Sequence, residues 1–286
     1  MGPSGRARAA GGPPIACPKR RCLQQQRGAM AMTRVSDRPV PKVSAGSLLA
    51  ASAWIVVAVC SAQCLAAQGP GEKAQTAAHE RPKPKKEQFG YQWKSLFDGK
   101  TLKGWKVPKF GGDGEVKVES GEIVLGMGDP MTGITWAGDF PRMNYEVTLE
   151  GKRTKGIDFF CSTTFPVGKD PCSFIVGGWA GTVVGLSCVD WYDASDNATS
   201  RFMAFKDNQW YKIRIRVSDK KIECWIDDEK MVDLVYKNHK ISIRDEMELC
   251  RPFGIATWCT EGRIRNIRVR RLRPEEVAEI PERPEQ

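Results

Sequence analysis

Apolar and polar residues alternate in several short segments of the chain. In residues 210–218, WYKIRIRVS places aliphatic side chains on one side of an extended strand and basic side chains on the other. EVKVE (115–119), NYEVTLEGK (144–152), KIECWID (221–227) and RIRNIRVRRL (263–272) repeat this period of two. No stretch shows a convincing helical period. Many short strands in one domain predict an all-β fold, a jelly-roll sandwich of two antiparallel sheets. The side chains expected between the sheets are Val147, Ile213, Ile215, Ile226 and Val269.

Composition divides the chain into four parts. Residues 1–67 form a basic leader, and residues 68–88 lack large apolar side chains, which is typical of a disordered linker. Residues 89–273 are long enough for one domain with a substantial core. Residues 274–286 are an acidic tail interrupted by prolines.

The positive charge lies mainly in the leader. Residues 1–67 contain nine Lys or Arg residues and one Asp, whereas the formal net charge of the whole chain is +10. The remainder is close to neutral, which argues against nucleic acid as a partner. An apolar run at 48–62 follows the basic segment and is typical of a signal peptide cleaved near Gln68. The alternative is a signal anchor. We therefore expect export to the periplasm, cell surface or extracellular space, with membrane contact only through a retained leader.

Cysteine and histidine usage limits the metal chemistry. Export permits disulfides among the six cysteines after the leader, and the sequence does not choose their pairing. None has C-x-x-C spacing, and residues 89–286 contain one histidine, His239, expected in an exposed turn. Zinc and haem therefore have little support as cofactors. The six cysteines are Cys161, Cys172, Cys188, Cys224, Cys250 and Cys259.

Two segments suggest a sheet face turned away from the core. In GIDFFCSTTF (156–165), alternation turns Phe159 inward and leaves Asp158 and Phe160 on the opposite face. In TVVGLSCVD (182–190), a glycine and a serine make the opposite face shallow. That shallowness has two interpretations: a place where a ligand approaches the backbone, or room for a crossing loop.

VDWYDASDN (189–197) is predicted to end a strand and continue as a rim loop, because Asp, Ser and Asn favour turns. At a ligand rim, Asp190 would act as an acid–base or hydrogen-bonding group and Trp191 would stack on a sugar. A second interpretation is calcium binding with help from other loops, since the Asp spacing does not match an EF-hand loop. A third is a plain solvated loop.

Further contacts to a substrate are expected from Trp179, Phe160 and Arg201. Trp179 lies in the glycine-rich IVGGWAG and is either a stacking ring or a loop plug. Arg201 would neutralise the acids of the rim loop or bind the substrate directly.

Four parts of the sequence resemble a known family. SLFDGKTLKGW (95–105) resembles the opening L-F-[ND]-G-K-x-L-x-G-W of the 3-keto-disaccharide hydrolase domain family of exported bacterial proteins. NYEVTLEGK, NQWYKIRIRV with KIECWIDDEKMVD, and FGIATW with RIRNIRVRRL resemble later strands of that family. The resemblance covers about residues 90–272 and implies a concanavalin-like fold.

The centre of the domain departs from the family pattern. TKGIDFF stands where the family often has G-N-S-G-I, and VVGLSCVD replaces Y-E-x-Q-I-L-D, keeping only Asp190. The resemblance implies cleavage of a glycoside oxidised at C3. The ketone acidifies the C2 proton, a base removes it, and the C1 group leaves by elimination. The base would be a carboxylate, and the catalytic candidates are Asp158, Asp190 and Asp193.

Two functions of other classes remain open. One is a non-catalytic carbohydrate-binding or cell-surface interaction module in which Trp179 and Trp191 stack on sugars. The other is a structural envelope domain held by disulfides. The enzyme and the binding module both predict a saccharide as the partner.

Overall fold

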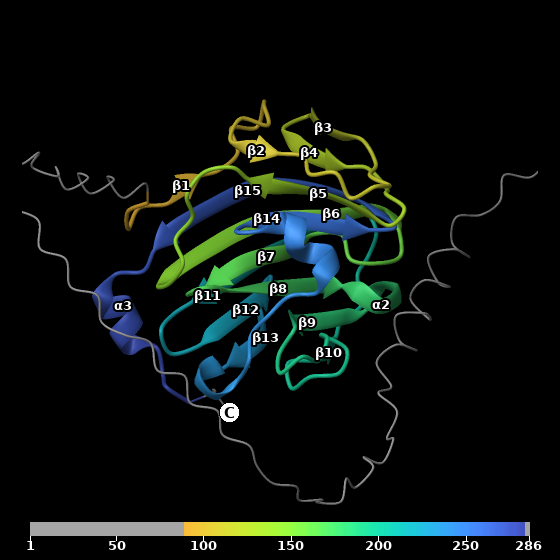
Figure 1. The fold of residues 1–286 in the computed structure, drawn as a ribbon. Helices are drawn as coiled ribbons and strands as arrows, with labels where there is room; N and C mark the ends of the chain where they lie inside the picture. The colour runs from red at the N-terminus through yellow and green to blue at the C-terminus, as the bar shows by residue number, and fades with distance from the viewer. Residues whose placement is uncertain (1–88, 284–286) are drawn as a thin grey trace, which may run out of the picture. The chain divides into compact units, whose positions relative to one another are not determined.

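Two antiparallel sheets form the domain in the computed structural model, which describes residues 89–283 (Figure 1). Within this range the first sheet has eight strands and the second has seven. The first sheet runs β13 (Glu229–Leu234), β12 (Ile222–Ile226), β11 (Trp210–Val217), β6 (Tyr145–Gly156), β15 (Thr260–Arg271), β4 (Glu122–Leu125), β3 (Val116–Glu119), with β1 (Lys94–Ser95) on β15. The second runs β10 (Arg201–Phe202), β9 (Val183–Ser187), β8 (Asp170–Gly177), β7 (Ser162–Val167), β14 (Gly254–Trp258), β5 (Met131–Trp136), β2 (Trp105–Lys106).

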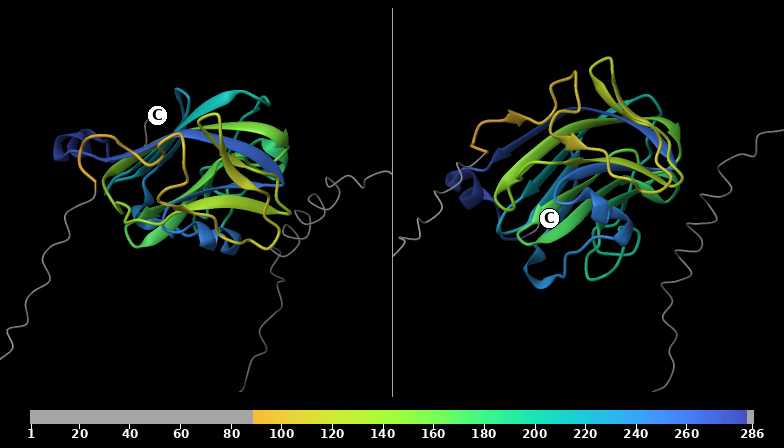
Figure 2. Two further views of the ribbon diagram at one scale, coloured as in Figure 1. Left: turned by 90° about the horizontal axis from the view of Figure 1, so that it is seen from above. Right: turned by 45° about the horizontal axis from the view of Figure 1, so that its top comes forward.

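The core lies between the two sheets, which stack face to face (Figure 2). The five aliphatic side chains expected there are all buried in it, as the alternation predicts. Ile213 of β11 lies opposite Leu149 of β6 and Ile226 of β12, so the register brings these inward side chains together. The predicted all-β sandwich of the concanavalin-like, jelly-roll class is therefore confirmed.

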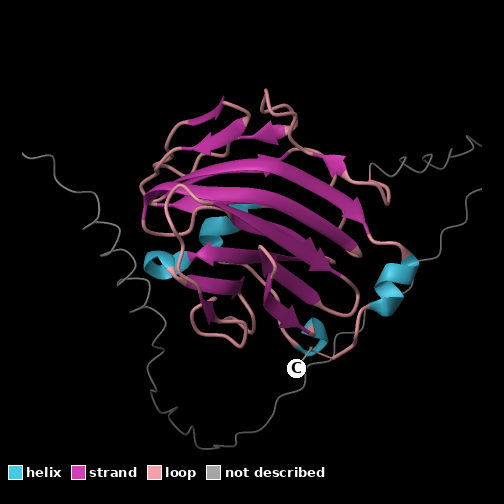
Figure 3. Ribbon diagram, turned by 180° about the vertical axis from the view of Figure 1, so that it is seen from behind, coloured by secondary structure: helices cyan, strands magenta, loops and turns pink. Residues whose placement is uncertain are grey.

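Helices are short and lie at the ends or surfaces of the sheets (Figure 3). Among residues 89–283, none combines the length and apolar character needed to cross a membrane. The leader at 1–67 and the linker at 68–88 lie outside the described residues. The helical segments are α2 (Gly178–Gly181), η1 (Tyr236–Asn238), η2 (Asp245–Cys250) and α3 (Pro274–Glu279).

The opening family motif builds a turn. Asp98 Oδ1 accepts hydrogen bonds from the amides of Lys100 and Thr101, at 2.8 and 2.7 Å. These bonds, led by that from Thr101, lower the pKa of Asp98 to about 2. Gly104 has a φ of 86°, and a Cβ there would lie 2.7 Å from the ring of Trp136. The motif therefore specifies the fold.

A segment crosses the face of the second sheet that is turned away from the first. We call residues 239–253 the strap; drawn in blue, it passes in front of β14 in Figure 1. Its Met247 and Cys250 are buried with Met131 and Ala256 of the sheet. Thr135 Oγ1 donates to a strap carbonyl, that of Leu249, at 2.7 Å.

This cover changes the face that the sequence suggests is open to a ligand. The hydroxyl side chains of Ser162, Thr164 and Ser173 point to that face, yet all three residues have no exposed surface. Thr164 and Ser173 are instead hydrogen-bonded to each other, with 2.8 Å between their hydroxyl oxygens. These positions on the outer face of the second sheet are thus buried beneath covering segments and are not open to a ligand.

A loop after β9, residues 188–200, explains the shallow positions of that strand. We call it the rim loop. A Cβ on Gly185 would lie 3.0 Å from the carbonyl oxygen of Thr199. The Leu186 amide donates to Thr199 Oγ1 at 2.9 Å, and Asn197 Nδ2 donates to the Leu186 carbonyl at 2.7 Å. Of the two interpretations of Gly185, the crossing loop is correct.

The sides expected for Phe159 and Phe160 are wrong. Phe160 is fully buried in the core between the sheets and packs edge-on against Phe205. Phe159 lies in a second apolar cluster with Met247 of the strap. Strand β7 begins only at Ser162, so strict alternation does not extend through the preceding residues.

Among the six cysteines of the domain, only Cys259 is disulfide-bonded. Five of them are free thiols, and all five are buried. Burial raises the pKa of the Cys250 thiol to about 12, and it raises those of the others as well. They behave as small apolar core residues. They are Cys161, Cys172, Cys188, Cys224 and Cys250.

The acidic segment from Pro274 folds onto the first sheet through residue 283. Glu276 of α3 accepts two hydrogen bonds from Arg270, at 2.8 and 2.9 Å. Lys220 Nζ donates to the carbonyl of Ile280 at 2.8 Å, and the Ile280 side chain is buried. Apolar burial and charge pairing therefore hold this end of the chain in place.

Replacement of Ile280 tests this attachment. Ile280→Ala should lower the free energy of unfolding by about 2 kcal/mol, because a buried aliphatic side chain is lost. Glu282→Ala, at an exposed neighbouring position, is the matched control and should change little. Urea denaturation of both variants provides the measurement, and equal stabilities would contradict the packing described.

Candidate active site

Backbone hydrogen bonds join the rim loop to the strap. The Cys188 amide donates to the Ser242 carbonyl at 2.6 Å, and the Ser242 amide donates back to the Cys188 carbonyl at 3.1 Å. Two residues further, the Asp190 amide donates to the Lys240 carbonyl at 2.8 Å. This antiparallel pairing fixes the beginning of VDWYDASDN against the beginning of the strap.

Asp190 and His239 form a hydrogen-bonded pair at this junction. Asp190 Oδ2 lies 2.6 Å from His239 Nδ1, and Asp190 Oδ1 accepts from the Lys240 amide at 2.8 Å. The bond from His239, followed by that from Lys240, lowers the pKa of the Asp190 carboxyl group. An ionised carboxylate only accepts, so His239 donates through Nδ1 and its Nε2 is the free nitrogen of the neutral ring.

Both members of the pair are accessible. The side chain of His239 is 32% exposed and that of Asp190 is 46% exposed. His239 directly follows η1, in a turn as the sequence suggests, and in addition a carboxylate sets the orientation of its ring. The sequence around Asp190 does not reveal this partner, because 49 residues separate Asp190 from His239.

Asp193 has a different partner. Its Oδ2 lies 2.6 Å from Nη1 of Arg244 on the strap, and its Oδ1 accepts from Ser187 Oγ at 3.3 Å. Arg244 also pairs with Glu246 at 3.0 Å. Hydrogen bonding to Glu246 and the charge of Asp193 raise the pKa of Arg244 above its usual value. Asp193 thus holds the strap against the rim loop.

Asp158 differs from Asp190 and Asp193 because it is buried and bonded to backbone amides. It is only 3% exposed, and its carboxylate accepts from the amides of Phe159 and Ala180, at 2.8 and 3.0 Å. Ala180 and its neighbour Trp179 have φ values of 67° and 49°, so this carboxylate stabilises an unusual turn. The structure brings Asp190 to His239 and does not bring Asp158 to either of them.

The two tryptophan candidates differ in exposure. Trp179 is partly buried against the apolar cluster beneath the strap, which agrees with its interpretation as a loop plug. Trp191 is 75% exposed, and Lys240 Nζ lies 6.0 Å from its ring centroid. The rings of Trp191 and the neighbouring Tyr192 are therefore largely exposed at the rim.

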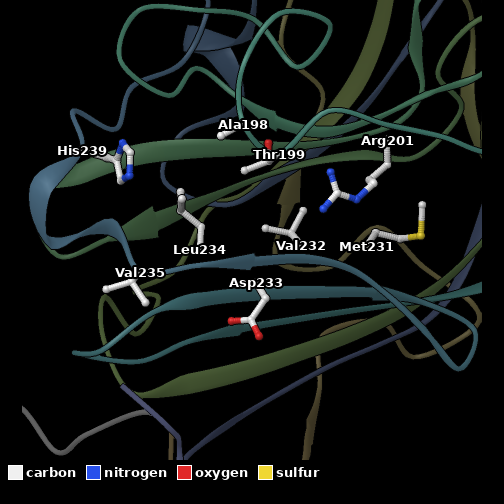
Figure 4. A pocket seen from close by; sticks show the side chains of 9 residues that line it. All are labelled: Ala198, Thr199, Arg201, Met231, Val232, Asp233, Leu234, Val235 and His239. Atoms are coloured by element: carbon white, nitrogen blue, oxygen red, sulfur yellow. The ribbon is translucent and has the colours of Figure 1, made fainter. Parts of the chain in front are cut away.

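A pocket of about 290 Å³ opens beside the Asp190–His239 pair, between edge strands β10 and β13 (Figure 4). Val232 and Leu234 form its apolar floor, with Arg201 near one end and His239 at the other. Of the predicted contact residues, Arg201 alone lines this pocket, and Phe160 lies in the core. The lining residues are Ala198, Thr199, Arg201, Met231, Val232, Asp233, Leu234, Val235 and His239.

The acids of the rim loop have protein partners. Asp190 is bound to His239 and Asp193 to Arg244. Within residues 89–283, no three His, Cys, Asp or Glu side chains gather in the manner of a metal site. Repulsion between the acids is thus relieved by side chains of the strap.

Substitution of Asp158 tests its role in the turn. Asp158→Asn should lower the free energy of unfolding by about 1–3 kcal/mol, because an amide nitrogen cannot accept from a second backbone N–H. Thermal unfolding measures the change. Unaltered stability would show that the carboxylate does not hold the turn.

The Asp190–His239 bond predicts a shift in titration. The folded protein releases the Asp190 proton more readily than the unfolded chain, so the stabilisation is present above about pH 4 and is lost as pH falls through the lower folded pKa. His239→Ala should raise the pKa of Asp190. The ¹³C shift of its carboxyl carbon, followed against pH, measures this directly. An unmoved midpoint would contradict the bond.

Comparison with known proteins shows which family this domain matches. Residues 92–270 match the model of the 3-keto-alpha-glucoside-1,2-lyase-like domain. No curated protein matches the chain.

Several solved structures are similar to this chain at low sequence identity. The Crh5 transglycosylase is 14% identical, with 66% of this chain and 88% of that chain covered and a TM-score of 0.46. A laminarinase from Flavobacterium sp. is 14% identical, with 63% and 99% covered and a TM-score of 0.43. The carbohydrate-binding module CBM66 from Bacillus subtilis is 12% identical, with 57% and 93% covered and a TM-score of 0.38. The family model matches more than half of the 286 residues of this chain. The chain therefore belongs to the family of 3-keto-alpha-glucoside-1,2-lyase-like domains.

Proposed function

We propose that the domain cleaves glycosides whose sugar ring is oxidised at C3, with His239 as the catalytic base. The observation that supports this most strongly is the Asp190–His239 pair on the rim of a pocket. Family membership supplies the class of reaction, and the pair supplies a base that the sequence alone does not reveal. The catalytic role expected of a carboxylate passes to the imidazole.

The division of labour follows from the hydrogen bond. Asp190 accepts the Nδ1 proton of His239 and so fixes both the ring orientation and the tautomer. His239 Nε2 then accepts the C2 proton of the substrate. A base of this kind contributes about 10²–10⁴ to a rate. Asp190 acts through His239 and is a positioning residue.

The proposed elimination removes a proton from C2 and the aglycone from C1. The C2–H bond breaks, and its electron pair forms the C1=C2 double bond, conjugated with the C3 ketone. The C1–O bond breaks either at the same time or after an enolate has formed. Its electron pair leaves with the aglycone oxygen. The proton ends on that oxygen through His239 or water. The ring product is an unsaturated 3-keto sugar.

The pocket matches one sugar ring in its character. Its apolar floor consists of Val232 and Leu234, which are nearly buried, and its polar groups lie at the two ends. Pockets that bind small ligands start at about 300 Å³, which is close to the volume observed here. Trp191 at the rim would contact a second sugar or the aglycone.

Export is part of the same proposal. The basic leader and the apolar run at 48–62 support secretion of a bacterial protein with a cleaved signal peptide. A secreted domain would meet glycosides outside the cell.

A second candidate function is saccharide binding without catalysis. The largely exposed rings of Trp191 and Tyr192 favour it, because exposed aromatic rings stack on sugars. In that case the Asp190–His239 pair would only hold the rim loop to the strap.

Turnover of p-nitrophenyl 3-keto-α-glucoside separates the two functions. Wild type should release nitrophenolate, and His239→Gln should lower kcat by about 10²–10⁴. Asp190→Asn should also lower kcat and should alter the pH profile, because the tautomer is no longer fixed. Lys237→Gln, at an exposed position two residues before His239, is the matched control.

Each outcome decides between the candidates. Full activity of folded His239→Gln would exclude this residue as the base. If wild type shows no turnover but binds oligosaccharide, and Trp191→Ala abolishes that binding, the domain is a binding module. Circular dichroism of every variant shows whether the fold is intact.

A further inference from the structure

The pocket has a cation at the end away from His239. Figure 4 shows the guanidinium of Arg201 reaching over the pocket from the rim, with Val232 and Leu234 between it and His239. Arg201 belongs to edge strand β10 and lies opposite Val184 of β9, so the sheet fixes the position of its backbone.

No carboxylate of the described domain neutralises Arg201. The one hydrogen bond of its side chain within residues 89–283 runs from Nη1 to the carbonyl of Ser200, at 2.9 Å. By contrast, Arg153 and Arg244 lie 2.6 Å from Asp207 and Asp193. Arg201 therefore keeps most of its five N–H donors for solvent or a ligand.

The acids close to the pocket are already paired. Asp233 of β13 turns its carboxylate away from Arg201 in Figure 4, and Lys221 and Lys230 lie 2.8 and 3.5 Å from it. Asp190 is bound to His239. The pocket consequently offers a net positive end to whatever enters it.

An anionic group is the ligand chemistry that fits such an end. A neutral sugar that covers the guanidinium would remove water without replacing the charge interaction. A carboxylate can accept two parallel N–H···O bonds from the planar guanidinium, and a sulfate ester can accept in a similar way. Each charge-assisted bond of this type strengthens binding by about 10-fold or more.

The shape of a pyranose ring indicates which substituent would face Arg201 when the C2 proton faces His239. C2 and C5 are opposite vertices of the six-membered ring, so a substituent on C5 points away from the C2 proton. With the C2 proton at His239, the C5 substituent would lie toward the other end of the pocket, where Arg201 is. Ring geometry and the two polar ends of the pocket therefore agree.

We infer that the pocket selects a 3-keto-glycoside with an acidic group on C5, and that Arg201 is the residue that recognises this group. The inference rests on the proposed function for the identity of the reacting atom. It adds the substrate class, an acidic sugar of the uronic type or a sugar sulfated at C6, and a specificity-determining residue.

Paired substrates test the selection. The p-nitrophenyl 3-keto-glucoside, its C6 carboxylate analogue and its C6 sulfate ester are compared by kcat/KM. Wild type should favour at least one acidic substrate over the neutral one by about 10-fold or more, as expected for one charge-assisted hydrogen bond. The two acidic substrates show whether a planar carboxylate or a sulfate is preferred.

Variants assign the preference to Arg201. Arg201→Gln should lower kcat/KM for the preferred acidic substrate far more than for the neutral one, and Arg201→Lys should restore part of the preference. Arg268→Gln replaces an exposed arginine of β15 and is the matched control. It should leave the ratio of the two rates unchanged.

Binding measurements keep this inference separate from the proposed activity. If no substrate is turned over, calorimetry with glucuronic acid, glucose 6-sulfate and glucose decides. Tighter binding of an acidic sugar that Arg201→Gln removes would support the anion site while the lyase proposal fails. Equal rates and equal affinities for neutral and acidic sugars would overturn the inference even if turnover is observed.

Discussion

The pairing of the rim loop with the strap is the interaction on which the rest of the site depends. Three contacts hold the two segments together: reciprocal backbone hydrogen bonds between Cys188 and Ser242, the Asp190–His239 hydrogen bond, and the ion pair of Asp193 with Arg244. The strap can then cover the outer face of the second sheet. Because that face is closed, the accessible pocket lies at the open edge between β10 and β13. VDWYDASDN is therefore a fastening segment that also carries half of a candidate catalytic pair.

The sandwich could be predicted because its information is local. In β11, each second residue from Ile213 to Val217 is buried, and a period of two in the sequence shows this without knowledge of any partner. The same logic failed before β7, where Phe160 enters the core from a segment that is not yet a strand. The family motif at 95–105 was informative for a related reason: Asp98, Gly104 and Trp105 specify a turn and its packing, and hence the fold.

The site was harder to predict because it depends on contacts distant in sequence. Asp190 and Asp193 were identified as an unusual cluster, but their partners His239 and Arg244 come from a segment about 50 residues later. Asp158 shows the opposite case. Its sequence context resembles that of an active-site acid, yet its carboxylate is occupied by two backbone amides. Only burial and hydrogen bonding distinguish such a structural carboxylate from an accessible one. The pocket itself joins the edges of two sheets, and no local pattern indicates which edges face each other.

We expect a saccharide to bind at the edge pocket and not on the outer face of the second sheet. The most direct test of this location is backbone-amide NMR during titration with a 3-keto C-glycoside, which has a carbon at C1 in place of the leaving oxygen and cannot be cleaved. Binding at the edge pocket should shift the amide signals of four residues around it, Thr199, Arg201, Val232 and His239. Shifts confined to Ser162, Thr164 and Ser173, beneath the strap, would contradict it.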